Sequence, residues 1–337
     1  MPTSLLHPSR LHIVLVHQAP IPVFAYGGTE RVIWDLGKAL VRLGHRVSYL
    51  VPEGSQCPFA EVRFLRPTGN WRDQIPAHAD IVHFQFSPSC ADTVGKPWLM
   101  TQHGNSQVDE DLPVNTVFLS ANHAERHAGA VYVHNGLDWE SYGAVRLNTP
   151  EAPYLHFLGK AAWRVKNVRG AIQTARKAGR RLEVLGGHRC NFRRGLRITL
   201  SLRVHFHGMV GGEAKLAVLR NSAGLLFPVR WHEPFGLAVI ESMYYGAPIF
   251  ATPYGALPEL VDSDTGVLQA SSRLLAEAIQ HFVPQRKRNH ERACDLFNAQ
   301  TMAAKYLRIY EQVLRGEPLH HQPPVMRTPA SPLPWGS

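Results

Sequence analysis

The sequence predicts an α/β protein of two domains, each built on a doubly wound parallel β-sheet. The chain has 337 residues, more than one hydrophobic core usually organises, so two domains of about 150 residues each are expected. Short apolar runs typical of buried strands alternate with stretches of helical periodicity. Glycine-containing turns stand between strand and helix, where sheets of this kind bind their ligands.

The first strand–helix–strand unit opens the chain. Apolar residues over 11–16 predict a strand, the helical spacing over 32–43 predicts a helix, and 47–51 predict a second strand. Gly27 and Gly28 fall between the first strand and the helix, where glycine lets backbone amides approach a phosphate. A Gly-Gly turn is common, however, and neither G-x-G-x-x-G nor a P-loop motif occurs.

Apolar runs continue this pattern along the chain, with a break of Pro, Gly and Asn near 142–153 that predicts the linker between the domains. We therefore place the first domain at 1–145 and the second at 146–300. Residues 316–337 are rich in Pro and lack periodicity, which predicts a disordered tail. The other predicted strands are 79–86, 98–102, 116–119, 130–133, 154–158, 182–185, 224–227 and 248–251, and the other helices are 214–219, 274–282 and 303–314.

The most informative stretch is 232–241, which follows a predicted buried strand and leads into a helix. Glu233 is expected in the loop and Glu241 about two turns into the helix. The first turn of a helix offers unpaired amides and positive partial charge. Here these amides belong to Phe235, Gly236 and Leu237. Two carboxylates around a ring of amides suit a nucleotide sugar, whose ribose diol donates hydrogen bonds, although either glutamate alone would be an ordinary solvated residue.

This string, with Gly-Ala-Pro at 246–248 and Gly-Ala-Leu-Pro-Glu at 255–259, resembles family 4 of the retaining glycosyltransferases. That family has the GT-B architecture, in which two Rossmann-like domains face each other across a cleft. The resemblance implies that Glu233 and the amides of 235–237 hold the donor sugar and that Glu241 holds the ribose. It places Glu259 in the segment that completes the donor pocket.

The resemblance extends into the first domain and beyond the second. Gly27 and Gly28 match the family's glycine-rich loop, which faces the donor diphosphate. His103 lies in a Thr-x-His segment whose histidine, in the family, approaches the donor sugar and the reaction centre; outside this context a lone histidine is usually structural. Residues 301–315 are the candidate for the helix that returns to the first domain in GT-B proteins. The strings at 25–31 and 231–237 resemble a bacterial subset that uses UDP-sugars.

Three cations lie between the first strand of the second domain and the helix that follows it. Lys160, Arg164 and Lys166 could neutralise the negative charge that develops on a departing diphosphate. The family has Gly-Arg, four residues and Lys, whereas this chain has Lys160 in place of the Arg and one extra residue before Lys166. Either Lys160 or Arg164 is therefore the phosphate partner of Lys166, and a solvated basic loop is the alternative.

We predict no obligatory metal and no cofactor, with the nucleoside-diphosphate sugar as a co-substrate. Two D-x-D strings, at 109–111 and 262–264, stand in polar loop contexts. His123 and His127 lie one helical turn apart without a third ligand, which predicts a solvated helix face. The four cysteines are far apart, which favours reduced structural thiols over a zinc site or a disulfide framework.

The predicted function is retaining transfer of a sugar, with UDP-glucose the first donor to consider, to a hydroxyl of an acceptor glycan, glycolipid or small molecule. Synthesis of lipopolysaccharide or another surface glycan is one such role. A nucleotide-sugar epimerase, a phosphorylase and a catalytically silent binding protein are the alternatives. The chain has a net charge of +10 and basic stretches at 189–203 and 286–288. These charges are equally consistent with contact with an anionic membrane and with an ordinary solvated surface. Aromatic residues are not interleaved with these clusters, so nucleic acid is not expected. Without a long apolar run, a cytoplasmic protein is expected.

Overall fold

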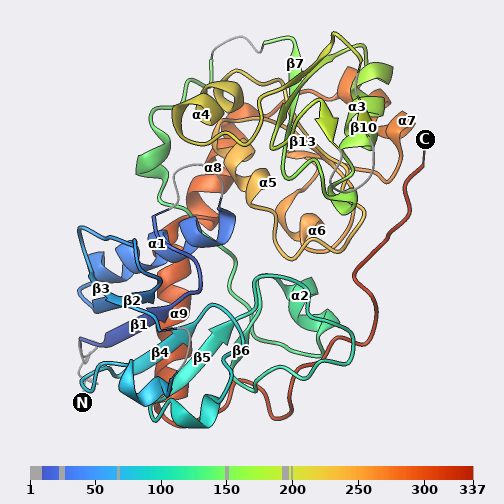
Figure 1. Ribbon diagram of the computed structural model, residues 1–337. Coiled ribbons are helices and arrows are strands. Elements are labelled where there is room, and N and C mark those ends of the chain that lie inside the picture. The colour runs from blue at the N-terminus through green and yellow to red at the C-terminus, as the bar shows by residue number, and fades with distance from the viewer. Residues whose placement is uncertain are drawn as a thin grey trace, which may run out of the picture.

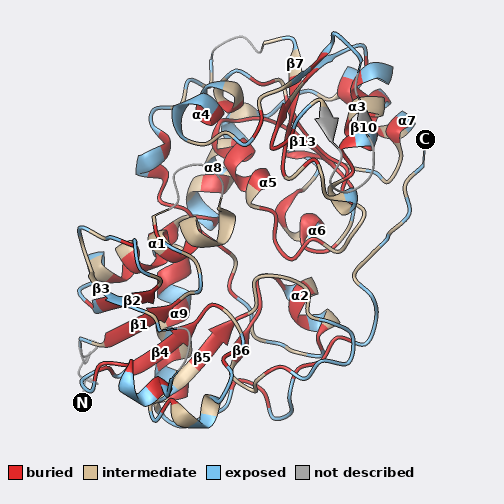
Figure 2. Ribbon diagram, viewed as in Figure 1, coloured by how far each residue is buried: buried red, intermediate tan, exposed pale blue. Residues whose placement is uncertain are grey.

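The protein consists of two α/β domains stacked one above the other, with most of each sheet buried (Figure 1, Figure 2). The structure is a computed structural model that describes residues 10–22, 27–66, 69–148, 152–191, 197–198 and 200–336. Parts of the predicted strings at 25–31 and 189–203 lie outside the described residues.

The first domain contains a six-stranded parallel sheet of order β3-β2-β1-β4-β5-β6. Its central strands are almost continuous apolar runs, as expected for a sheet covered on both faces. Its strands are β1 His12–Val16, β2 Arg46–Val51, β3 Glu61–Phe64, β4 Ile81–Phe84, β5 Trp98–Thr101 and β6 Thr116–Val117, and its helices are α1 Gly28–Arg42 and α2 Ala121–Arg126. The predicted strand at 130–133 is wrong, because this segment makes one isolated bridge, between Tyr132 and Phe118.

The second domain repeats this topology. Its six-stranded parallel sheet has the order β11-β8-β7-β12-β13-β14, so its strands, counted along the chain without the small hairpin, are again arranged 3-2-1-4-5-6. The strands are β7 Tyr154–Leu158, β8 Arg181–Leu185, β11 Val204–Phe206, β12 Leu225–Phe227, β13 Ile249–Ala251 and β14 Gly266–Leu268, and the hairpin is β9 Cys190–Asn191 with β10 Arg197–Ile198. The helices are α3 Val168–Lys177, α4 Gly212–Arg220, α5 Leu237–Tyr244, α6 Leu257–Leu260, α7 Ser272–His281 and α8 Arg286–Leu296.

The last helix, α9 Ala299–Leu314, lies against the first domain, beside α1 (Figure 1). A buried polar network fixes it there. His83 on β4 bonds the Tyr310 hydroxyl at 2.8 Å and the Thr101 hydroxyl at 2.7 Å, and Thr101 bonds the Tyr306 hydroxyl at 2.8 Å. Each polar group in this network has a partner, so the burial of four polar side chains costs little.

The chain after α9 is ordered, which corrects the predicted disordered tail. Residues 317–336, which we call the C-terminal strap, run beside the first domain and then cross to the second (Figure 1). Backbone bridges join Met326 to Val108 and Gly336 to Ser271, and the Ala330 carbonyl accepts from the His232 amide at 2.9 Å. Proline content predicted disorder, but these bonds use the strap's non-proline amides and its carbonyls, which Pro leaves available.

Acid should destabilise the folded protein because several histidines are buried in the uncharged form. Burial lowers the pKa of His83, His123 and His156 to about 3, from the ordinary value of 6.5. Between these values the unfolded chain binds more protons, so the free energy of unfolding falls as the pH falls, by up to about 1.4 kcal/mol per pH unit for each histidine. Burial raises the pKa of Asp35 to about 7, so this one carboxyl makes the free energy of unfolding rise as the pH falls. It offsets only part of the effect of the histidines.

Urea unfolding followed from about pH 7 to about pH 5 measures this effect. We expect the midpoint to fall steadily, and His156→Gln to reduce the slope by about one proton. A midpoint that does not change over this range would contradict the prediction.

Candidate active site

A cavity of about 360 Å³ lies between the two domains, within the range of small-ligand sites. It is reached from the carboxyl ends of the strands, where doubly wound sheets bind ligands. The structure brings ten of the twelve predicted site residues into its lining. These are Gly27, Gly28, His103, Lys160, Lys166, Glu233, Phe235, Gly236, Leu237 and Glu241.

Two helix N-termini meet at this cavity from opposite domains. Helix α1 begins at Gly28 and α5 at Leu237, and no side chain of the described residues caps either helix. A Cβ atom on Gly28 would lie 3.0 Å from Leu237 Cδ1, so a larger residue would crowd this approach. Gly236 has φ +114°, a backbone conformation that glycine adopts without strain. Two positive helix ends facing one cavity favour an anionic ligand such as a diphosphate.

Lys166 and Glu233 form an ion pair on the second-domain side of the cavity. Lys166 Nζ lies 2.7 Å from Glu233 Oε2, and the side chains are 12% and 9% exposed. Trp231 supports both, because its Nε1 donates to the same carboxylate oxygen at 2.7 Å and its ring lies 4.8 Å from the ammonium. A cation and a carboxylate are thus held in place without a ligand, ready to meet phosphate and hydroxyl groups.

Glu241 is 2% exposed and is held by groups from both domains. Arg31 on α1 donates to Oε1, as do Lys215 Nζ on α4 and the Tyr142 hydroxyl, each of these two at 2.6 Å. Burial would raise the pKa of this carboxyl, but the charges of Arg31 and Lys215 outweigh burial and hold the pKa well below its usual range. A ribose would therefore share a carboxylate that already bridges the domains.

Sequence reasoning missed these partners of Glu241. Arg31 belongs to the string that resembles the bacterial subset, but it was assigned no role. Lys215 stands within an otherwise mostly apolar stretch, 214–219, where a lysine without a surface position is a signal of a buried partner.

His103 reaches the cavity from the end of β5. Its Nε2 bonds Gln85 Oε1 at 2.8 Å. Burial, with the neighbouring His17, lowers its pKa to about 3, so the imidazole is neutral at physiological pH. A neutral imidazole suits hydrogen bonding to a sugar hydroxyl better than stabilisation of negative charge.

Arg164 and Glu259, the other two predicted site residues, do not line the cavity. Arg164 is exposed on the turn after β7, which leaves Lys160 as the cation beside Lys166. Glu259 instead bridges the domains, because its carboxylate accepts from the Asn122 and Ala121 amides at 2.7 and 3.0 Å, at the start of α2. Both assignments followed the order of residues in the family's motifs, which does not fix the direction of a side chain.

The remaining candidate ligand residues have structural partners. Asp109 pairs with Arg327 of the C-terminal strap at 2.8 Å, and Asp262 pairs with Arg292 at 3.1 Å. The predicted solvated face at His123 and His127 is wrong, because both rings are buried, and Phe118 lies beside each of them.

Solved structures of glycosyltransferases share this arrangement over nearly the whole chain. A glycosyltransferase involved in avilamycin A biosynthesis, AviGT4, superposes with a TM-score of 0.72 at 22% identity, covering 91% of this chain and 98% of that chain. The sucrose-phosphate synthase of Thermosynechococcus elongatus gives 0.72 at 19%, with 91% and 100% covered. This chain has the GT-B fold. The predicted pair of facing Rossmann-like domains is confirmed.

The protein-family comparison matches the second domain of this GT-B protein. Residues 152–284 match the family of glycosyl transferases group 1. A 114-residue segment is 33% identical to the GDP-mannose-dependent alpha-(1-6)-phosphatidylinositol dimannoside mannosyltransferase of Mycobacterium tuberculosis, covering 32% of this chain and 29% of that protein. A 41.2 kDa protein in the cps region of Klebsiella pneumoniae is 31% identical over 116 residues, 32% of each chain. The match thus covers about a third of these relatives, and family 4 and the bacterial type stay predictions.

Proposed function

We propose that the protein is a retaining glycosyltransferase that takes its sugar from a nucleoside diphosphate, with UDP-glucose the first donor to test. The observation that carries this proposal is the convergence on one cavity of two uncapped helix N-termini, Lys160 with Lys166, and Glu233 with Glu241. Cations and helix ends suit a diphosphate, and carboxylates suit the hydroxyls of sugar and ribose. In support, solved structures of Anabaena Alr3699/HepE, similar at 14% identity and a TM-score of 0.64, include complexes with UDP and UDP-glucose.

In the proposed mechanism the acceptor hydroxyl attacks the anomeric carbon from the face that the diphosphate leaves. The bond from the anomeric carbon to the phosphate oxygen breaks, and the departing phosphate takes the hydroxyl proton. Lys160 and Lys166 stabilise the negative charge that grows on the leaving oxygen, and the neutral His103 donates to or accepts from a sugar hydroxyl.

Incubation with UDP-, GDP- and ADP-sugars and a set of glycan and glycolipid acceptors tests this function. We expect free UDP together with a glycoside whose anomeric configuration is that of the donor. An isomerised sugar nucleotide without free UDP would identify an epimerase, and a sugar phosphate formed only with added phosphate would identify a phosphorylase. If calorimetry detects UDP binding but no donor is turned over, the protein is a sugar-nucleotide-binding protein without catalytic activity.

Transfer should need no divalent metal. The helix ends and two lysines supply the positive charge that a metal supplies in other architectures, and Asp109 has an arginine partner 2.8 Å away. We therefore expect activity to persist in excess EDTA. Complete loss of activity in EDTA that Mn²⁺ restores would contradict this prediction. It would make Asp109 and Asp111 candidate metal ligands again.

We propose that the acceptor is an anionic, membrane-linked glycolipid. The net charge is +10, and Lys287 and Arg288 lie exposed on α8, where each basic residue gains about 1 kcal/mol near an anionic surface. Among the described residues, no helix combines the length and apolar composition needed to span a bilayer. We expect sedimentation with anionic liposomes at low salt and release at high salt. No binding at low salt, together with efficient transfer to a soluble acceptor, would refute this proposal.

A further inference from the structure

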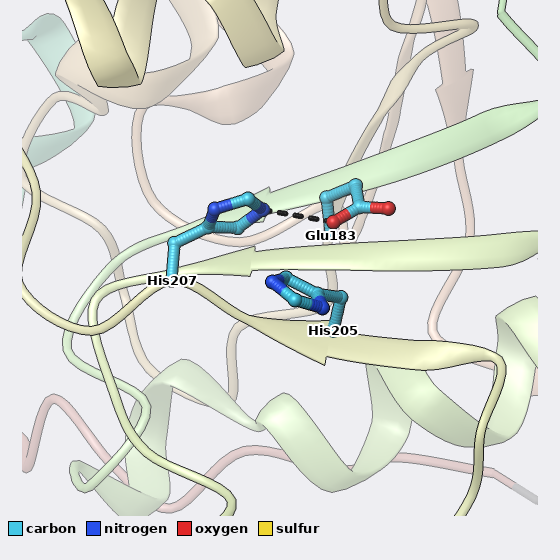
Figure 3. Close-up of side chains that lie close together, drawn as sticks. All are labelled: Glu183, His205 and His207. Carbon is cyan, nitrogen blue, oxygen red and sulfur yellow. Dashed lines mark hydrogen bonds and ion pairs between the residues drawn. The ribbon is translucent and has the colours of Figure 1, made fainter.

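Two histidines and a glutamate converge at the edge of the second sheet, outside the cavity (Figure 3). Glu183 on β8 lies beside His205 on the edge strand β11, and His207 follows two residues later. Alternate residues of a strand point to the same face, so both imidazoles and the carboxylate share one face of the sheet. One ligand atom from each residue lies within 4.8 Å of the others.

The backbone holds these three side chains on a rigid frame. The His207 amide donates to the Val184 carbonyl at 3.0 Å, and the turn that follows is fixed by a bond of 2.7 Å from the Gly186 amide to the Gly208 carbonyl. Sites built on strands keep their geometry better than sites built on loops. His207 Nε2 bonds Glu183 Oε2 at 2.8 Å, which orients both groups.

We propose that Glu183, His205 and His207 form a zinc site. Zinc binds imidazole nitrogens and carboxylate oxygens at about 2.0–2.2 Å, which places neighbouring ligand atoms about 3.3 Å apart in a tetrahedron, so small side-chain rotations close the site. Two imidazoles favour zinc over magnesium and calcium, which prefer oxygen ligands. His205 is exposed, so the fourth position is open to water.

The hydrogen bond to Glu183 accounts for the position of His207, and an edge-to-face contact between the two imidazoles accounts for that of His205. The two imidazole centroids lie 4.6 Å apart at 62°, so the rings do not stack flat, and Figure 3 shows the His205 ring beside the Glu183–His207 pair. The signal in the sequence is the His-x-His spelling at 205–207, which places two imidazoles on one side of a strand.

The site is separate from the proposed donor pocket, since none of its three residues lines the cavity. Zinc there would tie β11, an edge strand of three residues, to β8. The same strand leads to Val210, which does line the cavity, so the metal would steady one wall of the pocket from outside. Sugar-nucleotide binding is expected to survive its removal.

Titration of the chelator-treated full chain with Zn²⁺, and with Co²⁺ followed by its visible absorption, tests the proposal. We expect one tightly bound ion per chain, with at least about tenfold weaker binding for Glu183→Gln, His205→Ala and His207→Ala. His321→Ala, at an exposed histidine elsewhere in the chain, should bind like the unaltered protein.

Glu183→Gln is expected to fold normally, because it keeps the size of the side chain and an oxygen that accepts from His207. Weaker metal binding by this variant would therefore not result from misfolding. Thermal unfolding without metal checks that each variant is folded. Absence of a saturable one-to-one site, or equal affinity in the unaltered chain, Glu183→Gln and His205→Ala, would overturn the proposal.

Discussion

Lys166→Ala should lower the turnover number by about 10²–10³, because it removes a charge that is worth most when the leaving phosphate becomes negative. Donor affinity should fall less, since Lys160 and two helix N-termini still face the diphosphate. The variant also removes the Lys166 partner of Glu233, whose carboxylate still accepts from Trp231 at 2.7 Å. Steady-state kinetics with calorimetry of UDP binding separates the two effects.

Lys177→Ala is the matched control, because it removes an exposed lysine from the last turn of α3. Lys166→Met adds a second test, since it preserves apolar contact with the Trp231 ring while removing the charge. Turnover that stays unaltered in both Lys166 variants would exclude this lysine from the reaction.

Glu241→Ala should destabilise the protein by about 3–5 kcal/mol, because it leaves the buried Lys215 and the partly buried Arg31 without their carboxylate. Arg31 and Lys215 both donate to this group, and they come from different domains. The same variant should weaken UDP binding by about 1–3 kcal/mol if the ribose uses this carboxylate. Urea unfolding measures the first effect, and calorimetry below the unfolding transition measures the second.

Glu277→Ala provides the control for stability. Glu277 pairs with Arg273 on the surface of α7, both more than half exposed, and such pairs contribute little. Glu241→Gln keeps the shape of the side chain and removes only its charge. A Glu241→Ala variant as stable as the Glu277→Ala variant would show that the buried network does not hold the domains together, and unchanged UDP affinity would remove Glu241 from the donor site.

The sequence predicted structure best where the order of apolar and polar residues in one segment also determines how that segment packs in the fold. Central strands such as β1 and β4 are continuous apolar runs, because both faces of the sheet are covered. The string 232–241 carries its own strand end, turn and helix start, so its carboxylates and amides could be assigned to one site before any contact was known.

Prediction failed where position depends on contacts between distant segments. Edge strand β3 is half exposed and helix α8 is mostly polar, so neither shows a clear period. Glu241 is held by Arg31, more than two hundred residues away in sequence. Glu259 turns toward α2 because two backbone amides of the first domain lie within reach, and no motif encodes that direction.

The C-terminal strap limits how the cleft can open. The chain crosses between the domains near Leu137 and again before α9, where Leu137 and Asn298 form a backbone bridge, and the strap makes a third crossing at the right of the molecule in Figure 1. Thr328 is bonded to Arg126 of the first domain and Ala330 to His232 of the second, so two residues, about 7 Å at full extension, span the gap. A wider separation of the domains must first break one of these bonds, so the strap restrains the opening of the cleft. If the proposed transferase releases its product by such a separation, one of these bonds must break before release.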